Sequence, residues 1–145
     1  MCGIAGFIRF AGENRDSDYA LLGKMVETLY HRGPDESGLD IRSGVAMGMR
    51  RLSIIDLSSG SQPIYNEDRT VWTVFNGEIY NFPELKQDLQ SRGHVFATNT
   101  DTEVIVHGYE EWGEDFVERL NGMFAIALHD LASRTVILAR DHLGI

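Results

Sequence analysis

The chain contains one cysteine, Cys2, and only three prolines among its 145 residues. A single cysteine excludes an internal disulfide bond and any metal cluster built on several cysteines. No apolar run reaches the roughly 20 residues that a membrane-spanning helix needs. The N-terminus also lacks a charged segment followed by a long apolar stretch, so no signal peptide is predicted. The sequence therefore favours a cytoplasmic protein.

Basic residues are also scarce, with 13 Lys and Arg against 22 Asp and Glu, which gives a net charge of −9. Nucleic acids and anionic membranes are bound by clustered Lys and Arg, so neither is an expected partner. The histidines are scattered, no two of them are four residues apart, and their spacing fits no zinc motif. We therefore expect no metal site from the five histidines, which are His31, His94, His107, His129 and His142.

The length and the 43% hydrophobic content indicate one globular domain. Hydrophobic periodicity predicts helices over residues 16–30, 81–93, 100–112 and 114–120. It predicts strands over residues 3–10, 39–41, 45–50, 52–55, 71–75, 123–129 and 135–139. Runs of strands alternate with runs of helices, which favours an α+β fold with antiparallel sheet and helices layered on it.

Two short motifs have a local explanation that needs no ligand. Asn76-Gly77 is a common turn pair and predicts that the strand 71–75 ends there. Thr100 and Glu103 have the spacing of a capping box, in which each side chain satisfies a backbone N–H at the start of a helix. Each motif also carries polar groups that suit a binding site, so the function of both stays open at this level.

Cys2 is the most informative residue of the chain. Removal of Met1 places a thiol and a free α-amine on the same residue, and the pKa of such an amine is ordinarily about 7.7–8.0. A nucleophile and a general base then share one backbone unit, as in N-terminal threonine enzymes. The alternative is an incidental cysteine close to a frayed chain end.

Six motifs in one order give the chain a resemblance to a known family. They are Met-Cys-Gly-Ile from position 1, His-Arg-Gly-Pro-Asp from 31, Arg-Leu-Ser-Ile-Ile-Asp from 51, Asn-Gly-Glu-Ile-Tyr-Asn from 76, Thr-Asp-Thr-Glu from 100 and Arg-Asp-His-Leu-Gly from 140. Over its whole length the chain resembles the glutaminase domain of glutamine-hydrolysing asparagine synthetases. That domain is a class II glutamine amidotransferase of the N-terminal nucleophile (Ntn) hydrolase type. Some amidotransferases of surface-polysaccharide biosynthesis carry the same motifs, so the acceptor of the ammonia stays open.

The resemblance implies a four-layer αββα sandwich with two antiparallel sheets. It implies one amidotransferase domain over residues 2–145, incomplete at its C-terminus, with the synthetase domain absent. The implied reaction is the hydrolysis of glutamine to glutamate and ammonia through a γ-glutamyl thioester on Cys2. In the family the ammonia reaches a synthetase domain that makes asparagine from aspartate with ATP. No cofactor is therefore expected in this chain, because ATP and Mg²⁺ belong to the synthetase domain.

Three catalytic roles follow from the resemblance. Cys2 is the nucleophile, and its α-amine is the general base. The side-chain amide of Asn76 and the backbone N–H of Gly77 stabilise the oxyanion and contact the substrate. Loss of one such donor typically costs roughly 10²–10³ in rate.

The remaining assignments concern the amino-acid head of glutamine. Arg51 has the planar fork that matches a carboxylate in two parallel hydrogen bonds, and Glu78 and Asp101 are expected to hold the α-ammonium. The backbone of residues 52–55 is expected to line the pocket, and the loop 32–38 to order over bound glutamine. The implied partners are glutamine and a synthetase domain. The oligomeric state stays open, and a homodimer is one alternative. A glutamine-binding module without turnover is the alternative function.

Overall fold

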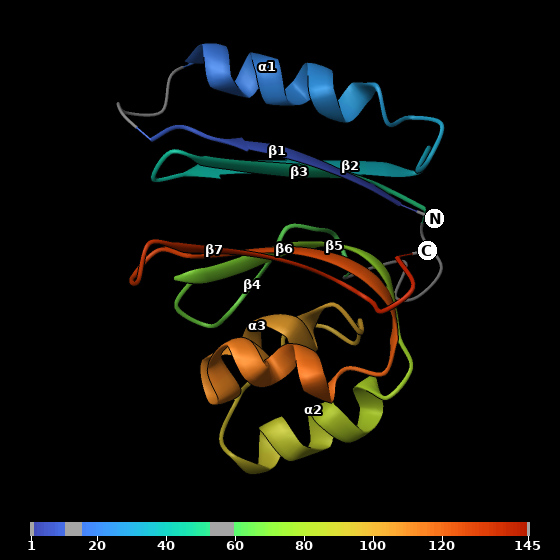
Figure 1. Ribbon diagram of the computed structural model, residues 1–145, viewed down its shortest axis with the longest axis vertical. Coiled ribbons are helices and arrows are strands. Elements are labelled where there is room, and N and C mark those ends of the chain that lie inside the picture. Colours follow the sequence, from blue (N-terminus) through green and yellow to red (C-terminus); the bar gives the residue numbers. More distant parts are fainter. Residues whose placement is uncertain (1, 11–15, 53–59, 145) are drawn as a thin grey trace.

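The computed structural model describes residues 2–10, 16–52 and 60–144. Its elements are β1 (Gly3–Ile8), α1 (Asp16–Glu27), β2 (Glu36–Arg42), β3 (Val45–Arg51), β4 (Ile64–Tyr65), β5 (Val71–Ile79), α2 (Phe82–Ser91), α3 (Glu103–Trp112), a 3₁₀ helix (Gly113–Arg119), β6 (Gly122–Asp130) and β7 (Thr135–Arg140). They form one sheet in the order β1-β3-β2 and a second in the order β4-β5-β6-β7, with antiparallel pairing throughout. The sheets stack face to face, α1 covers the first, and α2 and α3 cover the second (Figure 1). The predicted αββα sandwich is thus confirmed.

The central strand β3 is buried on both faces because a helix covers one side and the second sheet the other. Side chains alternate between the faces of a strand. Met47 and Met49 accordingly pack with Trp72 of the second sheet. Ala46, from the opposite face, packs with Val26 of α1. This double burial explains why β3 reads as a nearly continuous apolar run until it reaches two arginines.

The second sheet has its own core against the helical layer. Phe75 and Ile126, from its two central strands, pack with Ile105 of α3 and Phe116 of the 3₁₀ helix. Leu89 anchors α2 in the same core and is fully buried. Among the described residues, no helix is long and apolar enough to cross a membrane.

The prediction of a turn at Asn76-Gly77 is wrong. β5 runs through both residues to Ile79, and Asn76 lies opposite Ala125 while Gly77 lies opposite Phe124. A turn pair marks a turn only when the chain has to reverse there. Here β6 offers a ladder partner along the whole length of β5, so the sheet overrides the local preference.

The predicted capping box at Thr100 and Glu103 is also wrong. α3 begins at Glu103, its N-cap residue is Thr102, and no side chain caps the helix. The carboxylate of Glu103 instead accepts hydrogen bonds from the backbone N–H groups of Ala97 and Thr98, each at 2.7 Å. The reason lies in the tertiary structure. The segment before α3 folds back over the first turn of the helix, and its backbone N–H groups occupy the Glu103 carboxylate that would otherwise cap the helix.

Several boundaries differ by a few residues. β2 begins at Glu36 rather than at residue 39, and the short strand β4 was not predicted. The expected strand 52–55 fails at Leu52, which lies outside β3, and its other residues lie outside the described part of the chain. The predicted start of α2 is confirmed, with Asn81 at the N-cap and a proline in the first turn. The side chain of Asn81 does not cap that helix, because it bonds Arg119 O and Asn121 N instead.

Candidate active site

All six residues that the sequence singled out lie around one pocket. The pocket forms where the start of β1, the end of β3, the second half of β5 and the residues before α3 meet. It therefore joins both sheets with the helical layer. Its lining includes Cys2, Arg51, Asn76, Gly77, Glu78 and Asp101.

Cys2 is half-buried at the edge of the pocket. The pairing of Gly3 with Arg50 brings the start of β1 beside the end of β3. The backbone N–H of Leu52 donates to Cys2 Sγ at 3.3 Å, and Arg32 Nε donates to the Cys2 carbonyl oxygen at 3.4 Å. These contacts hold Cys2 and its sulfur beside the end of β3.

Asn76 and Gly77 form the opposite wall. The side-chain oxygen of Asn76 is buried and has no hydrogen-bond partner among the described residues, which is uncommon for a buried polar atom. Gly77 has φ +155°, and a Cβ at this position would lie 2.1 Å from Met123 O. Only glycine fits against β6 here, so the backbone of Gly77 can border the pocket without a side chain in the way.

Arg51 is 5% exposed at the end of β3. Its Nη1 donates to Glu36 Oε2 at 3.1 Å, and Glu36 lies opposite it in the ladder of β2 and β3. The guanidinium is thus held in a fixed direction at the pocket wall by a neighbouring strand.

Asp101 is 5% exposed in the segment that precedes α3. Its Oδ2 accepts from the Ile79 backbone N–H at 2.9 Å, and its Oδ1 accepts from Thr100 Oγ1 at 3.2 Å. Burial raises the pKa of the Asp101 carboxyl, and these hydrogen bonds partly oppose the rise. Thr100 thus orients a carboxylate of the pocket. The sequence pattern did not indicate this role, because it predicted Thr100 as a helix cap. Glu78, half-buried on β5, completes the acidic side of the pocket.

Gln62 is a pocket residue that the sequence did not reveal. It is 8% exposed, its Nε2 donates to Phe75 O at 3.1 Å, and the Phe75 N–H donates to its Oε1 at 2.7 Å. Both hydrogen bonds hold the backbone of Phe75, the residue just before Asn76. A glutamine in a polar stretch gives no local signal for such a role, because the contact spans 13 residues.

The loop before β2 is tied to the end of β3. Arg50 donates through Nε to Gly33 O at 2.8 Å and through Nη2 to Pro34 O at 3.2 Å, and the Asp35 N–H donates to Arg51 O at 3.2 Å. The predicted loop 32–38 is therefore shorter, since Glu36 and the residues after it belong to β2. Closure of this loop over a substrate stays a prediction.

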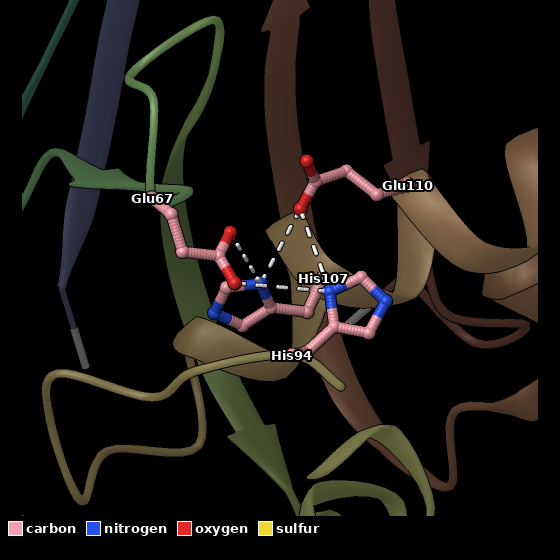
Figure 2. A group of neighbouring side chains, drawn as sticks. All are labelled: Glu67, His94, His107 and Glu110. Carbon is pink, nitrogen blue, oxygen red and sulfur yellow. Dashed lines mark hydrogen bonds and ion pairs between the residues drawn. The ribbon is translucent and has the colours of Figure 1, made fainter. Parts of the chain in front are cut away.

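Among the described residues, one group of side chains has the separation of metal ligands, and its members do not line this pocket. Figure 2 shows the group, which consists of Glu67, His94, His107 and Glu110.

Two solved structures have a similar architecture. A glutamine phosphoribosylpyrophosphate amidotransferase from Bacillus subtilis, complexed with ADP and GMP, is similar with a TM-score of 0.55 at 24% identity, over 72% of this chain and 24% of that chain. A structure titled as the allosteric regulatory enzyme of purine biosynthesis gives a TM-score of 0.54 at 24% identity, over 70% of this chain and 24% of that one. At this identity the likeness establishes the fold alone, which is the αββα sandwich with two antiparallel sheets.

The sequence establishes the family. Residues 1–145 match the glutamine amidotransferase domain family, and the chain belongs to it. Over 100% of its length it is 45% identical to asparagine synthetase [glutamine-hydrolyzing] 2 of Bacillus subtilis (strain 168) and 46% identical to asparagine synthetase [glutamine-hydrolyzing] 2 of Oryza sativa subsp. japonica. The matched segments are 19% and 24% of those two proteins, so the chain spans about a fifth to a quarter of their length. The resemblance read from the six motifs is thus confirmed.

Proposed function

We propose that the chain hydrolyses glutamine to glutamate and ammonia. One observation carries the proposal: the single cysteine, at position 2, shares a pocket with an asparagine amide, a backbone glycine, an arginine and two carboxylates. Such a set provides a nucleophile, oxyanion donors and groups of both signs for the head of an amino acid. Membership of the glutamine amidotransferase family supports the same substrate.

In the proposed reaction, Cys2 acts after Met1 has been removed. The α-amine of Cys2 takes the thiol proton, and the sulfur attacks the side-chain amide carbon of glutamine. The negative charge that develops on the amide oxygen is stabilised by the Asn76 side-chain amide and the Gly77 N–H. The α-amine then returns the proton to the departing ammonia. Water attacks the γ-glutamyl thioester, which releases glutamate and restores the thiol.

The head of glutamine is held by charge complementarity. Arg51 receives the α-carboxylate, because a guanidinium matches two carboxylate oxygens at once. Asp101 and Glu78 receive the α-ammonium. Binding the head at both charges places the side-chain amide near Cys2. The binding energy of the head is thus used to orient the amide carbon for attack by the sulfur.

The ammonia is proposed to pass to a synthetase domain. The two relatives reported above are named as glutamine-hydrolysing asparagine synthetases and are about four to five times the length of this chain. We therefore propose ATP-dependent asparagine synthesis from aspartate for the intact protein, in the cytoplasm, with another ammonia acceptor as the alternative. A homodimer, the domain limits 2–145 and the lack of a nucleotide site in this chain stay predictions.

The proposal is tested by intact-mass spectrometry and glutamate release, with and without the glutamine affinity label 6-diazo-5-oxo-norleucine. We expect a mass without Met1, release of glutamate from glutamine, and one label per chain on Cys2. A folded chain that lacks Met1 and binds glutamine, but neither turns over nor accepts the label, is a binding module, and the proposed hydrolysis is then wrong.

Replacing Asp101 with Asn is expected to raise the KM for glutamine roughly 10–100-fold, because a hydrogen bond to a charged partner is lost. In the wild-type protein, burial raises the pKa of Asp101. The ionised form that binds an ammonium is therefore lost at a higher pH than for an ordinary Asp, and KM should rise as the pH falls through that pKa. The measurement is kcat/KM for glutamine against pH.

Asp115→Asn is the matched control, because Asp115 is exposed in the 3₁₀ helix. Its KM and pH profile should follow those of the wild-type protein. A KM for Asp101→Asn within twofold of wild type would remove Asp101 from substrate recognition.

A further inference from the structure

Four side chains converge on the outer side of the second sheet. Glu67 comes from the turn between β4 and β5, His94 follows α2, and His107 and Glu110 stand one turn apart on α3 (Figure 2). One potential ligand atom from each lies within 4.8 Å of the other three. Three segments that are distant in sequence thus present two imidazoles and two carboxylates to one point.

The separations between the ligand atoms are close to those of a tetrahedral metal site, and two of them match it. His107 Nδ1 is 3.5 Å from Glu67 Oε2 and 3.3 Å from Glu110 Oε2. His94 Nδ1 is 3.8 Å from the same Glu110 oxygen and 4.0 Å from Glu67 Oε1. Zinc bonds to nitrogen and oxygen measure about 2.0–2.2 Å, which puts tetrahedral ligands about 3.3–3.6 Å from one another. The two distances to His94 are longer than this, so His94 has to move toward the other three ligands when a metal ion binds.

Each carboxylate is anchored through one oxygen and presents the other. The Val95 N–H donates to Glu67 Oε1 at 2.9 Å, and Asn66 Nδ2 donates to Glu110 Oε1 at 2.7 Å. In both residues Oε2 is the oxygen that faces the buried histidine, His107. The anchoring bonds fix both carboxylates with a ligand oxygen directed at the shared centre.

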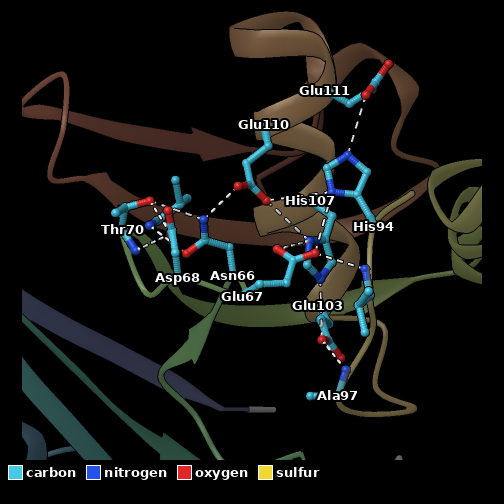
Figure 3. A network of polar contacts seen from close by, with 12 residues as sticks. Asn66, Glu67, Asp68, Thr70, His94, Ala97, Glu103, His107, Glu110 and Glu111 are labelled. Atoms are coloured by element: carbon cyan, nitrogen blue, oxygen red, sulfur yellow. Dashed lines mark hydrogen bonds and ion pairs between the residues drawn. The ribbon is translucent and has the colours of Figure 1, made fainter. Parts of the chain in front are cut away.

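Both histidines have a second carboxylate behind them. His107 Nε2 lies 3.4 Å from Glu103 Oε1, and His94 Nε2 lies 3.5 Å from Glu111 Oε2 (Figure 3). A ligand histidine in a protein usually donates its outer ring N–H to such a carboxylate, which fixes the tautomer and strengthens the inner nitrogen as a ligand. Both rings meet this condition with Nδ1 pointing inward.

We propose that Glu67, His94, His107 and Glu110 bind one zinc ion that ties the β4–β5 turn and the segment after α2 to α3. Two neutral imidazoles and two carboxylates balance the charge of a divalent cation. Nitrogen and oxygen donors together suit Zn²⁺ better than Mg²⁺ or Ca²⁺, which prefer oxygen donors alone. The side chain of His107 is fully buried and that of Glu67 is 41% exposed, so the site has a rigid floor and an open side for entry.

A proton on His107 is the competing occupant. Burial lowers the pKa of His107, but hydrogen bonds to Glu103 and Glu110 and the charge of Glu67 outweigh it and raise the pKa to about 9. The same geometry is then an ion-pair network without metal. The two readings differ in a measurable way, because metal binding displaces protons from its ligands and a network alone takes up no metal.

The test is isothermal titration of the chelator-treated, full 145-residue chain with ZnCl₂, in two buffers of different ionisation enthalpy. A Cys2→Ala background removes the one thiol, which also binds zinc. We expect one Zn²⁺ per chain, proton release on binding, tighter binding at pH 8 than at pH 6, a higher Tm with zinc, and no binding of Mg²⁺ at the same concentration.

Variants localise the site. His94→Ala and Glu67→Gln change partly exposed side chains and should weaken zinc binding by at least about 100-fold, while Glu111→Gln, behind His94, should weaken it about 10-fold. His31→Ala, at an exposed histidine outside the group, should leave the affinity unchanged. The proposal is overturned if the wild-type chain takes up no zinc saturably, or if it binds zinc equally well after His94→Ala and Glu67→Gln.

Discussion

Replacement of Cys2 with Ala is expected to lower glutamine hydrolysis by roughly 10⁴-fold or more, which is the order of loss when the nucleophile of a catalytic unit is removed. No other thiol exists in the chain to replace it. The fold should not change, because Cys2 is only half-buried at the margin of the core between the sheets. The measurement is kcat for glutamate release.

Glutamine binding and Cys2→Ser serve as controls for this variant. Alanine and serine are both small, so Met1 removal should proceed as in the wild-type protein. Calorimetry should show that Cys2→Ala still binds glutamine, because Arg51 and Asp101 remain. Turnover by Cys2→Ala within tenfold of the wild-type rate would show that the sulfur is not the nucleophile.

Gly77→Ala is expected to destabilise the protein by about 3 kcal/mol or more, since it combines overpacking with a backbone conformation that disfavours a side chain. The added Cβ would lie 2.1 Å from Met123 O and 2.7 Å from Phe124 Cα, and β6 cannot retreat because β7 and the core hold it. For a chain of this length, such a loss lowers Tm by about 10 °C. The measurement is thermal and urea unfolding, and the folded fraction should also hydrolyse glutamine more slowly.

Gly23→Ala is the matched control. Gly23 lies in α1, and a Cβ there meets nothing within 4 Å. The same substitution should raise the free energy of unfolding by about 0.5–1 kcal/mol, because alanine favours a helix over glycine. If Gly77→Ala were as stable as Gly23→Ala, the close packing of β5 on β6 would be wrong.

The candidate site was predictable because its residues lie in short, ordered motifs. Cys2 is distinctive by its position. Arg51, Asn76 and Asp101 each lie in a sequence motif that resembles the same family. Such motifs are read without knowledge of the three-dimensional contacts. The structure added what the motifs do not contain, such as the grip of Gln62 on the strand before Asn76 and the hydrogen bond from Thr100 to Asp101.

The sequence by itself determined the α+β class, most strands and helices, and the family, because periodicity and ordered motifs are local properties of the chain. Tertiary structure decided where local and long-range preferences compete. Asn76-Gly77 continues a strand because β6 supplies its partners. The cluster of Glu67, His94, His107 and Glu110 has no spacing signal, since its members come from three segments that only the packing of α3 on the second sheet brings together. A contact between distant segments depends on the free energy of the whole fold, and no local pattern records it.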